Sequence, residues 1–163
     1  MKVVFQYDAG PGLRRRLEAL AAEGFEVAPC EETDQARFRA LLADAEVLWH
    51  VLMPITAEAI AAAPKLRFIQ KVGVGVNTID LAAARARGIA VCNMPGTNSR
   101  AVAEMTLLLI LAALRRICWF DARTRGGQGW PLAPEIQDHL GEVAGRTVGL
   151  VGYGAVPRLL APV

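Results

Sequence analysis

The chain has 163 residues, of which 53% are hydrophobic and 21% charged, with a net charge of +2 and a mean hydropathy of +0.30. This length suffices for one domain, or for one domain and part of another, and the composition is typical of a globular protein. Basic residues are mixed with acidic ones, and the densest cluster, Arg14–Arg16, is predicted to be a solvated helix face, which argues against a nucleic-acid-binding surface.

Histidines and cysteines are few, and their positions argue against two kinds of site. No pair of them has the spacing of metal ligands, so no metal site is expected. An odd number of widely separated cysteines indicates a reducing, cytoplasmic setting rather than a disulfide scaffold. The residues concerned are Cys30, Cys92, Cys118, His50 and His139.

Neither the N-terminus nor the most apolar stretch predicts a membrane segment. Asp8 and Gly10 follow the first residues too early for a signal peptide. Residues 101–114 form the longest apolar stretch, but it is shorter than the roughly 20 residues that a membrane span needs, and it contains Glu104. This stretch is therefore predicted to be a buried helix.

Predicted strands alternate with predicted helices along the first part of the chain. Short apolar runs bounded by turn residues predict strands over residues 2–7, 25–29, 46–51, 67–72 and 89–93. Helical spacing and capping residues predict helices between the turn at residues 8–12 and Gly24, and over 33–43, 56–63 and 79–87. Such an α/β pattern with short connections implies a parallel, flavodoxin-like (Rossmann-like) sheet with helices on both faces.

The second part of the chain departs from this alternation. A long helix is predicted from Asn98 to about Trp119, followed by a loop rich in glycine and proline over residues 123–134. Residues 146–151 are then predicted to be the opening strand of a second Rossmann domain. The expected division is a first domain over 1–97, an interdomain helix over 98–120 and the incomplete start of a nucleotide-binding domain over 121–163.

A glycine turn follows the predicted strand 146–151. Gly152 and Gly154 stand where a strand runs into a helix, an arrangement that points backbone N–H groups at a pyrophosphate. Pro157 occupies the place of the third glycine of the full fingerprint, and the acidic ribose-binding residue would fall beyond Val163. A plain strand-to-helix turn therefore remains the alternative.

A second glycine-rich turn, residues 71–80, joins a predicted strand to the next helix. Ligands of open α/β sheets bind at the carboxyl ends of strands, where glycines let backbone N–H groups reach an anion. The alternative is a tight turn in which Asn77 or Thr78 caps the helix. A third segment, residues 93–104, is a strand end and turn leading into a helix with few polar positions, which must be buried between layers or domains.

These three segments, VGVGVNTID, NMPGTNSRAVAE and GLVGYGAVP, together resemble the D-isomer-specific 2-hydroxyacid dehydrogenase family. The resemblance implies two Rossmann-like domains with the substrate in the cleft between them. It also implies NAD- or NADP-dependent hydride transfer between the nicotinamide and a 2-hydroxy or 2-keto acid. Asn77 replaces the aspartate usual in this family, a departure expected to alter capping more than binding.

The resemblance also assigns roles to individual positions. The backbone at Val74 and Gly75 corresponds to the substrate-carboxylate site, and Val102 corresponds to a position near the nicotinamide. The turn that begins at Gly152 corresponds to the pyrophosphate site, with amides at Gly154, Ala155 and Val156 facing the phosphates.

No catalytic residue is expected in this chain. The arginine, glutamate and histidine of the family lie well beyond the nucleotide turn, and none has a counterpart here. His50 and His139 precede that turn and are expected to be structural or exposed. The leading hypothesis is therefore a truncated family member that is inactive alone and binds NAD or NADP poorly.

Two other hypotheses remain open. A second chain with the missing half would make a split enzyme, and a flavodoxin-like domain that binds a small anion would be a module without catalysis. Apolar residues on the long helix and on the tail need another cover, so a homodimer, by exchange of elements between chains, is favoured.

Overall fold

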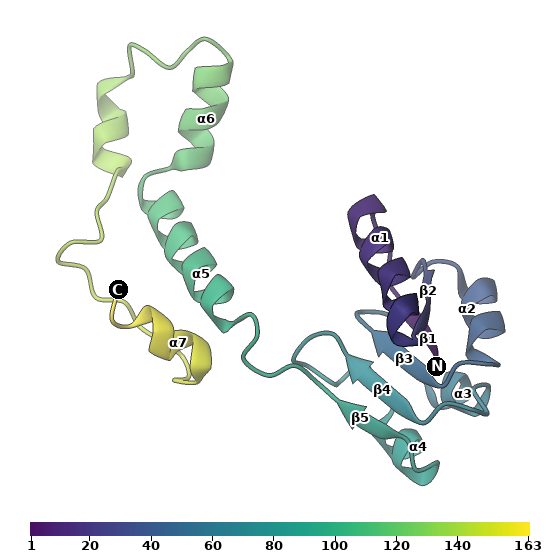
Figure 1. Cartoon of the computed structure of the whole chain (residues 1–163). Helices are drawn as coiled ribbons and strands as arrows, with labels where there is room; N and C mark the ends of the chain where they lie inside the picture. The colour runs from purple at the N-terminus through teal and green to yellow at the C-terminus, as the bar shows by residue number, and fades with distance from the viewer. The chain divides into compact units, whose positions relative to one another are not determined.

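The computed structural model describes residues 1–163 and divides into two compact units, Met1–Pro95 (unit 1) and Gly96–Val163 (unit 2) (Figure 1). Unit 1 holds a five-stranded parallel sheet in the order β2-β1-β3-β4-β5. Each strand lies within one residue of its expected bounds, and the predicted parallel, flavodoxin-like sheet is confirmed. The strands are β1 Lys2–Gln6, β2 Glu26–Cys30, β3 Val47–His50, β4 Phe68–Lys71 and β5 Ala90–Cys92.

The helices of unit 1 begin and end at recognisable residues. Asp34 caps α2 by accepting a hydrogen bond from Arg37 N at 2.9 Å, and Asp80 caps α4 by accepting from Ala83 N at 2.9 Å. The cap of α4 is thus Asp80, and not Asn77 or Thr78, because the chain turns once more before the helix begins. The bounds are α1 Pro11–Ala19, η1 Leu20–Glu23, α2 Gln35–Leu42, α3 Ala57–Ala61 and α4 Leu81–Ala86.

The two faces of the sheet carry separate apolar clusters, because successive strand residues point to opposite faces. On one face Leu48 and Ile69, which are paired across β3 and β4, pack with apolar side chains of α2, α3 and α4. On the other face Phe5 and Trp49 pack with Leu17 of α1. Helices therefore cover both faces, as the sequence predicts.

Unit 2 is helical. Its elements are α5 Ser99–Leu114, α6 Ile117–Arg125, η2 Pro134–His139 and α7 Ala155–Leu160. The single helix expected over 98–119 is in fact two, because Arg116 adopts a left-handed backbone conformation (φ 51°) that interrupts the helix. The loop expected from residue 123 begins instead at Gly126, which follows the end of α6. None of the helices combines the length and the apolar character that crossing a bilayer requires.

The strand expected over residues 146–151 is not part of any sheet. A strand is completed by backbone hydrogen bonds to a neighbour, and no other segment of unit 2 supplies one. The glycine turn and α7 nevertheless follow this segment as the sequence predicts.

The three cysteines are unpaired. Cys30 ends β2 and is buried, and burial raises the pKa of its thiol above the ordinary value. Cys92 ends β5 in unit 1 and Cys118 lies in α6 of unit 2, and both are exposed.

Candidate functional site

The turn after β4 lies at the edge of the sheet where the parallel strands end, and its shape requires glycine. Gly73 has a φ of 153°, and a Cβ atom there would lie 3.3 Å from Cε of Lys71. A Cβ atom on Gly75 would lie 3.0 Å from Oδ1 of Asn77, closer than side chains ordinarily pack. The positive φ of Gly73 and the close contacts at both positions therefore favour glycine in this turn.

Residues at the end of β5 hold this turn by its carbonyl groups. Met94 N donates to the Gly73 carbonyl at 2.8 Å, and Asn93 Nδ2 donates to the Val74 carbonyl at 2.7 Å. The N–H groups of Val74 and Gly75 donate to no acceptor in the chain, and Val74 is 45% exposed. Two neighbouring backbone donors are thus available to an anion at the carboxyl edge of the sheet.

A second loop borders this edge, directly after β3. The Glu32 carboxylate accepts hydrogen bonds from the N–H groups of Leu52 and Met53, each at 3.2 Å. Both apolar side chains remain exposed, so this rim of the site is apolar. Glu32 lies in an irregular connection, where no local sequence pattern predicts such a role.

A buried polar network lies at the ends of β1, β3 and β4, next to the turn. His50 Nδ1 is 3.3 Å from Oε1 of Gln6, and His50 Nε2 is 2.8 Å from Oγ1 of Thr78. Lys71 Nζ donates to the Val51 carbonyl and is 3.4 Å from Thr78 Oγ1. Because the Gln6 oxygen can only accept, His50 donates from Nδ1 and accepts at Nε2 from the Thr78 hydroxyl.

The electrostatics of this network favour a neutral imidazole beside a cation. Burial, and secondarily the charge of Lys71, lowers the pKa of His50 to about 4. Burial also lowers the pKa of Lys71 from its ordinary value, while the negative charge of Glu32 opposes that shift. At neutral pH the network therefore holds one positive charge, on Lys71, and His50 is not poised for proton transfer.

The positions expected to bind a cofactor all lie in unit 2. Val102 lies in the first turn of α5 and is 41% exposed. Gly152 has a φ of 86°, Gly154 is the N-cap of α7, and Ala155 and Val156 open that helix. The N–H groups of Ala155 and Val156 donate to no acceptor in the chain.

The approach to this glycine turn is open. A Cβ atom on Gly152 or Gly154 would meet no atom within 4 Å. Arg158 Nε donates to the Tyr153 carbonyl at 3.2 Å, which ties the turn to α7 on its carbonyl side. The turn therefore fits a phosphate group, while no ribose-binding carboxylate follows it within residues 155–163.

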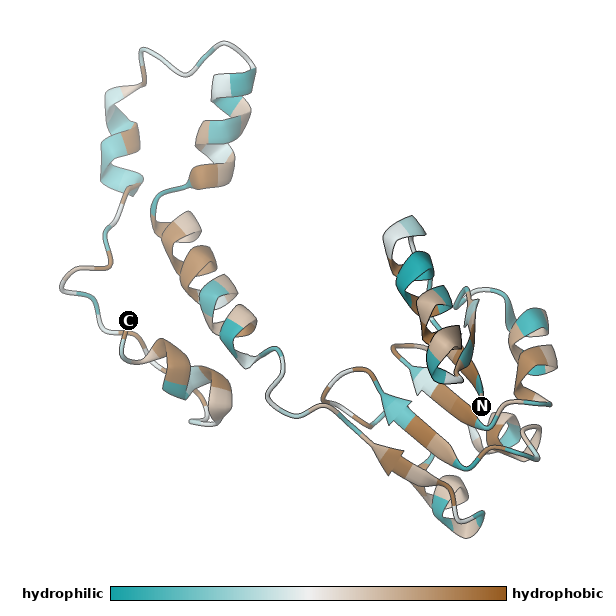
Figure 2. Ribbon diagram, in the orientation of Figure 1, coloured by the Kyte–Doolittle hydropathy of each residue, from teal (hydrophilic) through white to brown (hydrophobic).

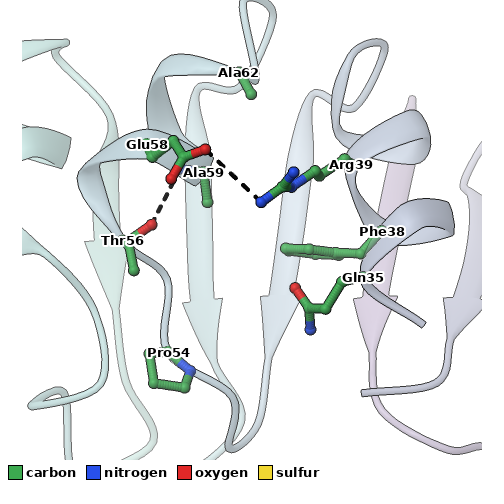
Figure 3. A pocket seen from close by; sticks show the side chains of 8 residues that line it. All are labelled: Gln35, Phe38, Arg39, Pro54, Thr56, Glu58, Ala59 and Ala62. Atoms are coloured by element: carbon green, nitrogen blue, oxygen red, sulfur yellow. Dashed lines mark hydrogen bonds and ion pairs between the residues drawn. The ribbon is translucent and has the colours of Figure 1, made fainter. Parts of the chain in front are cut away.

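A separate cavity of about 260 Å³ lies between α2 and α3 (Figure 3). Arg39 and Glu58 face each other across it, with Nη2 and Oε1 3.7 Å apart. Both side chains are exposed, and no buried polar group is left without a partner there. We assign no ligand to this cavity.

The family model for the catalytic domain of D-isomer specific 2-hydroxyacid dehydrogenases matches residues 4–154. The chain belongs to this family. It is 35% identical over 144 residues to a D-3-phosphoglycerate dehydrogenase of Mycobacterium leprae, covering 88% of this chain and 26% of the relative. It is 40% identical over 109 residues to a glyoxylate reductase of Korarchaeum cryptofilum, covering 66% of this chain and 32% of the relative.

Solved structures show the same relationship. The TT0316 protein of Thermus thermophilus superposes with a TM-score of 0.87 at 32% identity, over 99% of this chain and 52% of that one. The NAD complex of a formate dehydrogenase from Staphylococcus aureus superposes with a TM-score of 0.83 at 26% identity, over 99% of this chain and 52% of that one. This family member thus spans about half the length of the solved chains and a smaller share of the two relatives.

Proposed function

We propose that the turn at Gly73–Gly75 binds the carboxylate of a 2-hydroxy or 2-keto acid through the N–H groups of Val74 and Gly75. The supporting observation is the anchoring of this turn. Its carbonyls accept hydrogen bonds from the end of β5, while its two N–H groups remain free at an exposed edge. A carboxylate has two oxygen atoms that can accept from neighbouring N–H groups, so its geometry suits this turn.

The parent activity that we propose is NAD- or NADP-dependent transfer of hydride to or from C2 of that acid. The glycine turn of unit 2, at Gly152 and Gly154, would hold the pyrophosphate through the N–H groups of Gly154, Ala155 and Val156. Val102 would lie near the nicotinamide, which when bound supplies or accepts the hydride. Related proteins have been solved with such a cofactor, among them a formate dehydrogenase with NAD and a glyoxylate/hydroxypyruvate reductase with NADP and malonate.

We further propose that these 163 residues alone do not turn over substrate. Reduction of a keto acid needs a proton donor within hydrogen-bonding distance of its oxygen. His50 is buried with both ring nitrogens engaged, and its lowered pKa leaves it neutral at pH 7. His139 lies on η2 in the other unit and is exposed. Binding of NAD or NADP by this chain is expected to be weak, since it offers one phosphate turn.

The organisation that we propose is a substrate domain over 1–97, an interdomain helix over 98–120 and the start of a cofactor domain over 121–163. Helix α5 is apolar over much of its length, as the brown colouring in Figure 2 shows, and several of its large apolar side chains are exposed. Such a surface supports a homodimer in which a second copy covers it. The three free thiols support a reducing, cytoplasmic setting.

A titration tests the carboxylate site. The ¹⁵N-labelled chain is titrated with sodium glycolate while the backbone N–H signals of Val74 and Gly75 are followed. We expect saturable shifts of both signals with glycolate and none with ethylene glycol, which lacks the carboxylate. The absence of a saturable shift with glycolate would contradict the proposal.

The same chain is then assayed for oxidation of NADH with glyoxylate or hydroxypyruvate. We expect no turnover, and measurable turnover would refute the proposed inactivity.

A further inference from the structure

Lys71 ends β4 and is the residue that leads into the carboxylate-binding turn. Only 7% of its surface is exposed. Its side chain runs next to the turn, since Cε lies 3.3 Å from the place of a Cβ atom on Gly73. Its ammonium group donates to the Val51 carbonyl, in the loop after β3, and lies 3.4 Å from Thr78 Oγ1, at the far end of the turn.

This lysine is buried without a carboxylate in contact. Its two recorded partners are a carbonyl and a hydroxyl, and no salt bridge includes it. Glu32 is near enough to affect its titration, but the Glu32 carboxylate is engaged by the N–H groups of Leu52 and Met53. Burial of a charge is costly unless hydrogen bonds compensate it, and here a positive charge is retained at an edge proposed to receive an anion.

We propose that Lys71 is a positioning residue of the carboxylate-binding turn. It ties the loop after β3 to the exit of the turn, and its positive charge favours an anion at the N–H groups of Val74 and Gly75. The inference rests on the proposed function of that turn. Two of the three N–H groups of its ammonium have partners inside the protein, the Val51 carbonyl and Thr78 Oγ1, so Lys71 acts through the backbone and its field.

In this network each group donates a hydrogen bond to the next one, from Lys71 to Gln6. This order holds the Lys71 ammonium beside Thr78. The ammonium donates to Thr78, the Thr78 hydroxyl donates to His50 Nε2, and His50 Nδ1 donates to Gln6. Each bond in such a chain polarises the next one. The Thr78 backbone carbonyl also accepts from Ile55 N at 2.8 Å, so the exit of the turn is held from two sides.

The test compares three variants of the full 163-residue chain. Lys71→Met removes the charge and keeps a long side chain, and Lys71→Arg keeps the charge. The matched control is Lys65→Met, since Lys65 is an exposed lysine that pairs with Asp44. Glycolate affinity is measured at low and at high sodium chloride, and the ¹⁵N order parameters of Val74 and Gly75, which report how firmly the turn is held, are measured without ligand.

We expect Lys71→Met to weaken glycolate binding on the order of tenfold, to reduce its salt dependence and to lower the order parameters of both N–H groups. Lys71→Arg should restore most of the affinity, and Lys65→Met should change none of these quantities. The imidazole titration of His50, read by its ring NMR signals, should move to higher pH in Lys71→Met because a nearby positive charge is removed. This shift verifies that the substitution has removed the charge beside His50.

Unchanged glycolate affinity and unchanged order parameters in Lys71→Met would overturn the inference. If the wild-type chain does not bind glycolate, the proposed function of the turn fails. The positioning role is then decided by the order parameters of Val74 and Gly75 alone. If Lys71→Met does not fold, Thr78→Val replaces it in the test, because this substitution removes the hydroxyl partner of Lys71. We expect the same changes in Thr78→Val, but smaller ones. Unchanged values in Thr78→Val would also overturn the inference.

Discussion

Unit 1 and unit 2 differ in how far they bury their own apolar side chains. All the buried apolar residues lie in unit 1 except Ala103 and Ile136. Unit 2 instead exposes large side chains along α5, including Leu108 at 55% and Leu109 at 61%. A helix that is apolar all round needs cover on several sides. Unit 1 therefore contains what it needs to fold, whereas the apolar side chains of unit 2 need contacts that its own residues do not provide.

The largest effect is expected from truncating the core of unit 1. Leu48→Ala should lower the free energy of unfolding by about 2–5 kcal/mol, because Leu48 is fully buried between two paired strands. Leu109→Ala in unit 2 is the matched control and should change stability by less than about 0.5 kcal/mol. Amide hydrogen exchange of β3 and β4 measures both. Equal effects of the two substitutions would break the contrast between the units.

The next effect is a pH dependence of the stability of unit 1, which we do not expect for unit 2. The pKa of His50 is lowered to about 4, so between pH 4 and 6.5 the unfolded chain binds more protons than the folded one. Stability should therefore fall as the pH falls through this window, by up to about 3 kcal/mol. Urea denaturation at a series of pH values measures the slope.

Substitution of each histidine provides the control for this slope. His50→Gln should remove it, while His139→Gln should leave it unchanged because His139 is exposed on η2. The ion pairs of Asp44 with Lys2 and Lys65 hold the pKa of Asp44 at about 2, so its own contribution is lost only below this window. A slope that survives in His50→Gln would show that another group carries it.

A smaller effect is expected at the carboxylate-binding turn. Gly73→Ala should destabilise unit 1 by about 1–3 kcal/mol, because the backbone there has a positive φ and the new Cβ atom would crowd Lys71. Gly12→Ala in α1 meets open space and should instead stabilise by about 0.5–1 kcal/mol. Thermal unfolding compares the two variants. Destabilisation by both would indicate that Gly12 of α1 does not face open space.

The smallest effect on stability, and the one that bears most on unit 2, concerns association. Leu108→Lys combined with Leu109→Lys should leave the unfolding of unit 1 unchanged and convert a homodimer into a monomer. Sedimentation velocity at micromolar concentration gives both masses. A monomeric wild-type chain would contradict the proposed dimer. The exposed apolar surface of α5 would then need to be covered by something other than a second copy.

The sheet could be predicted because its signals are local. Each strand is a short apolar run, and each connection ends in a cap or a turn residue whose chemistry acts within a few residues. The break at Arg116 could not, since arginine has no preference for a left-handed conformation. Residues 146–151 have the composition of a strand, but pairing depends on a neighbour that unit 2 does not supply.

The site was predictable only where backbone chemistry defines it. Glycine spacing points to the turn at Val74 and Gly75, whereas the roles of Glu32 and Lys71 depend on contacts between distant segments. Thr78 illustrates the difference. Its position predicts a helix cap, but the fold brings His50 within 2.8 Å of its hydroxyl and leaves Asp80 to cap the helix.

The distribution of the cysteines allows one label to be attached to each unit. Cys30 is shielded and its thiol pKa is raised, so a maleimide reagent at neutral pH should leave it unmodified. Cys92 and Cys118 are accessible, one in each unit. The sequence thus carries a pair of attachment points for spin labels. A dipolar distance between them would report how far the carboxyl edge of the sheet lies from the helical unit, before and after an acid or a nucleotide is added.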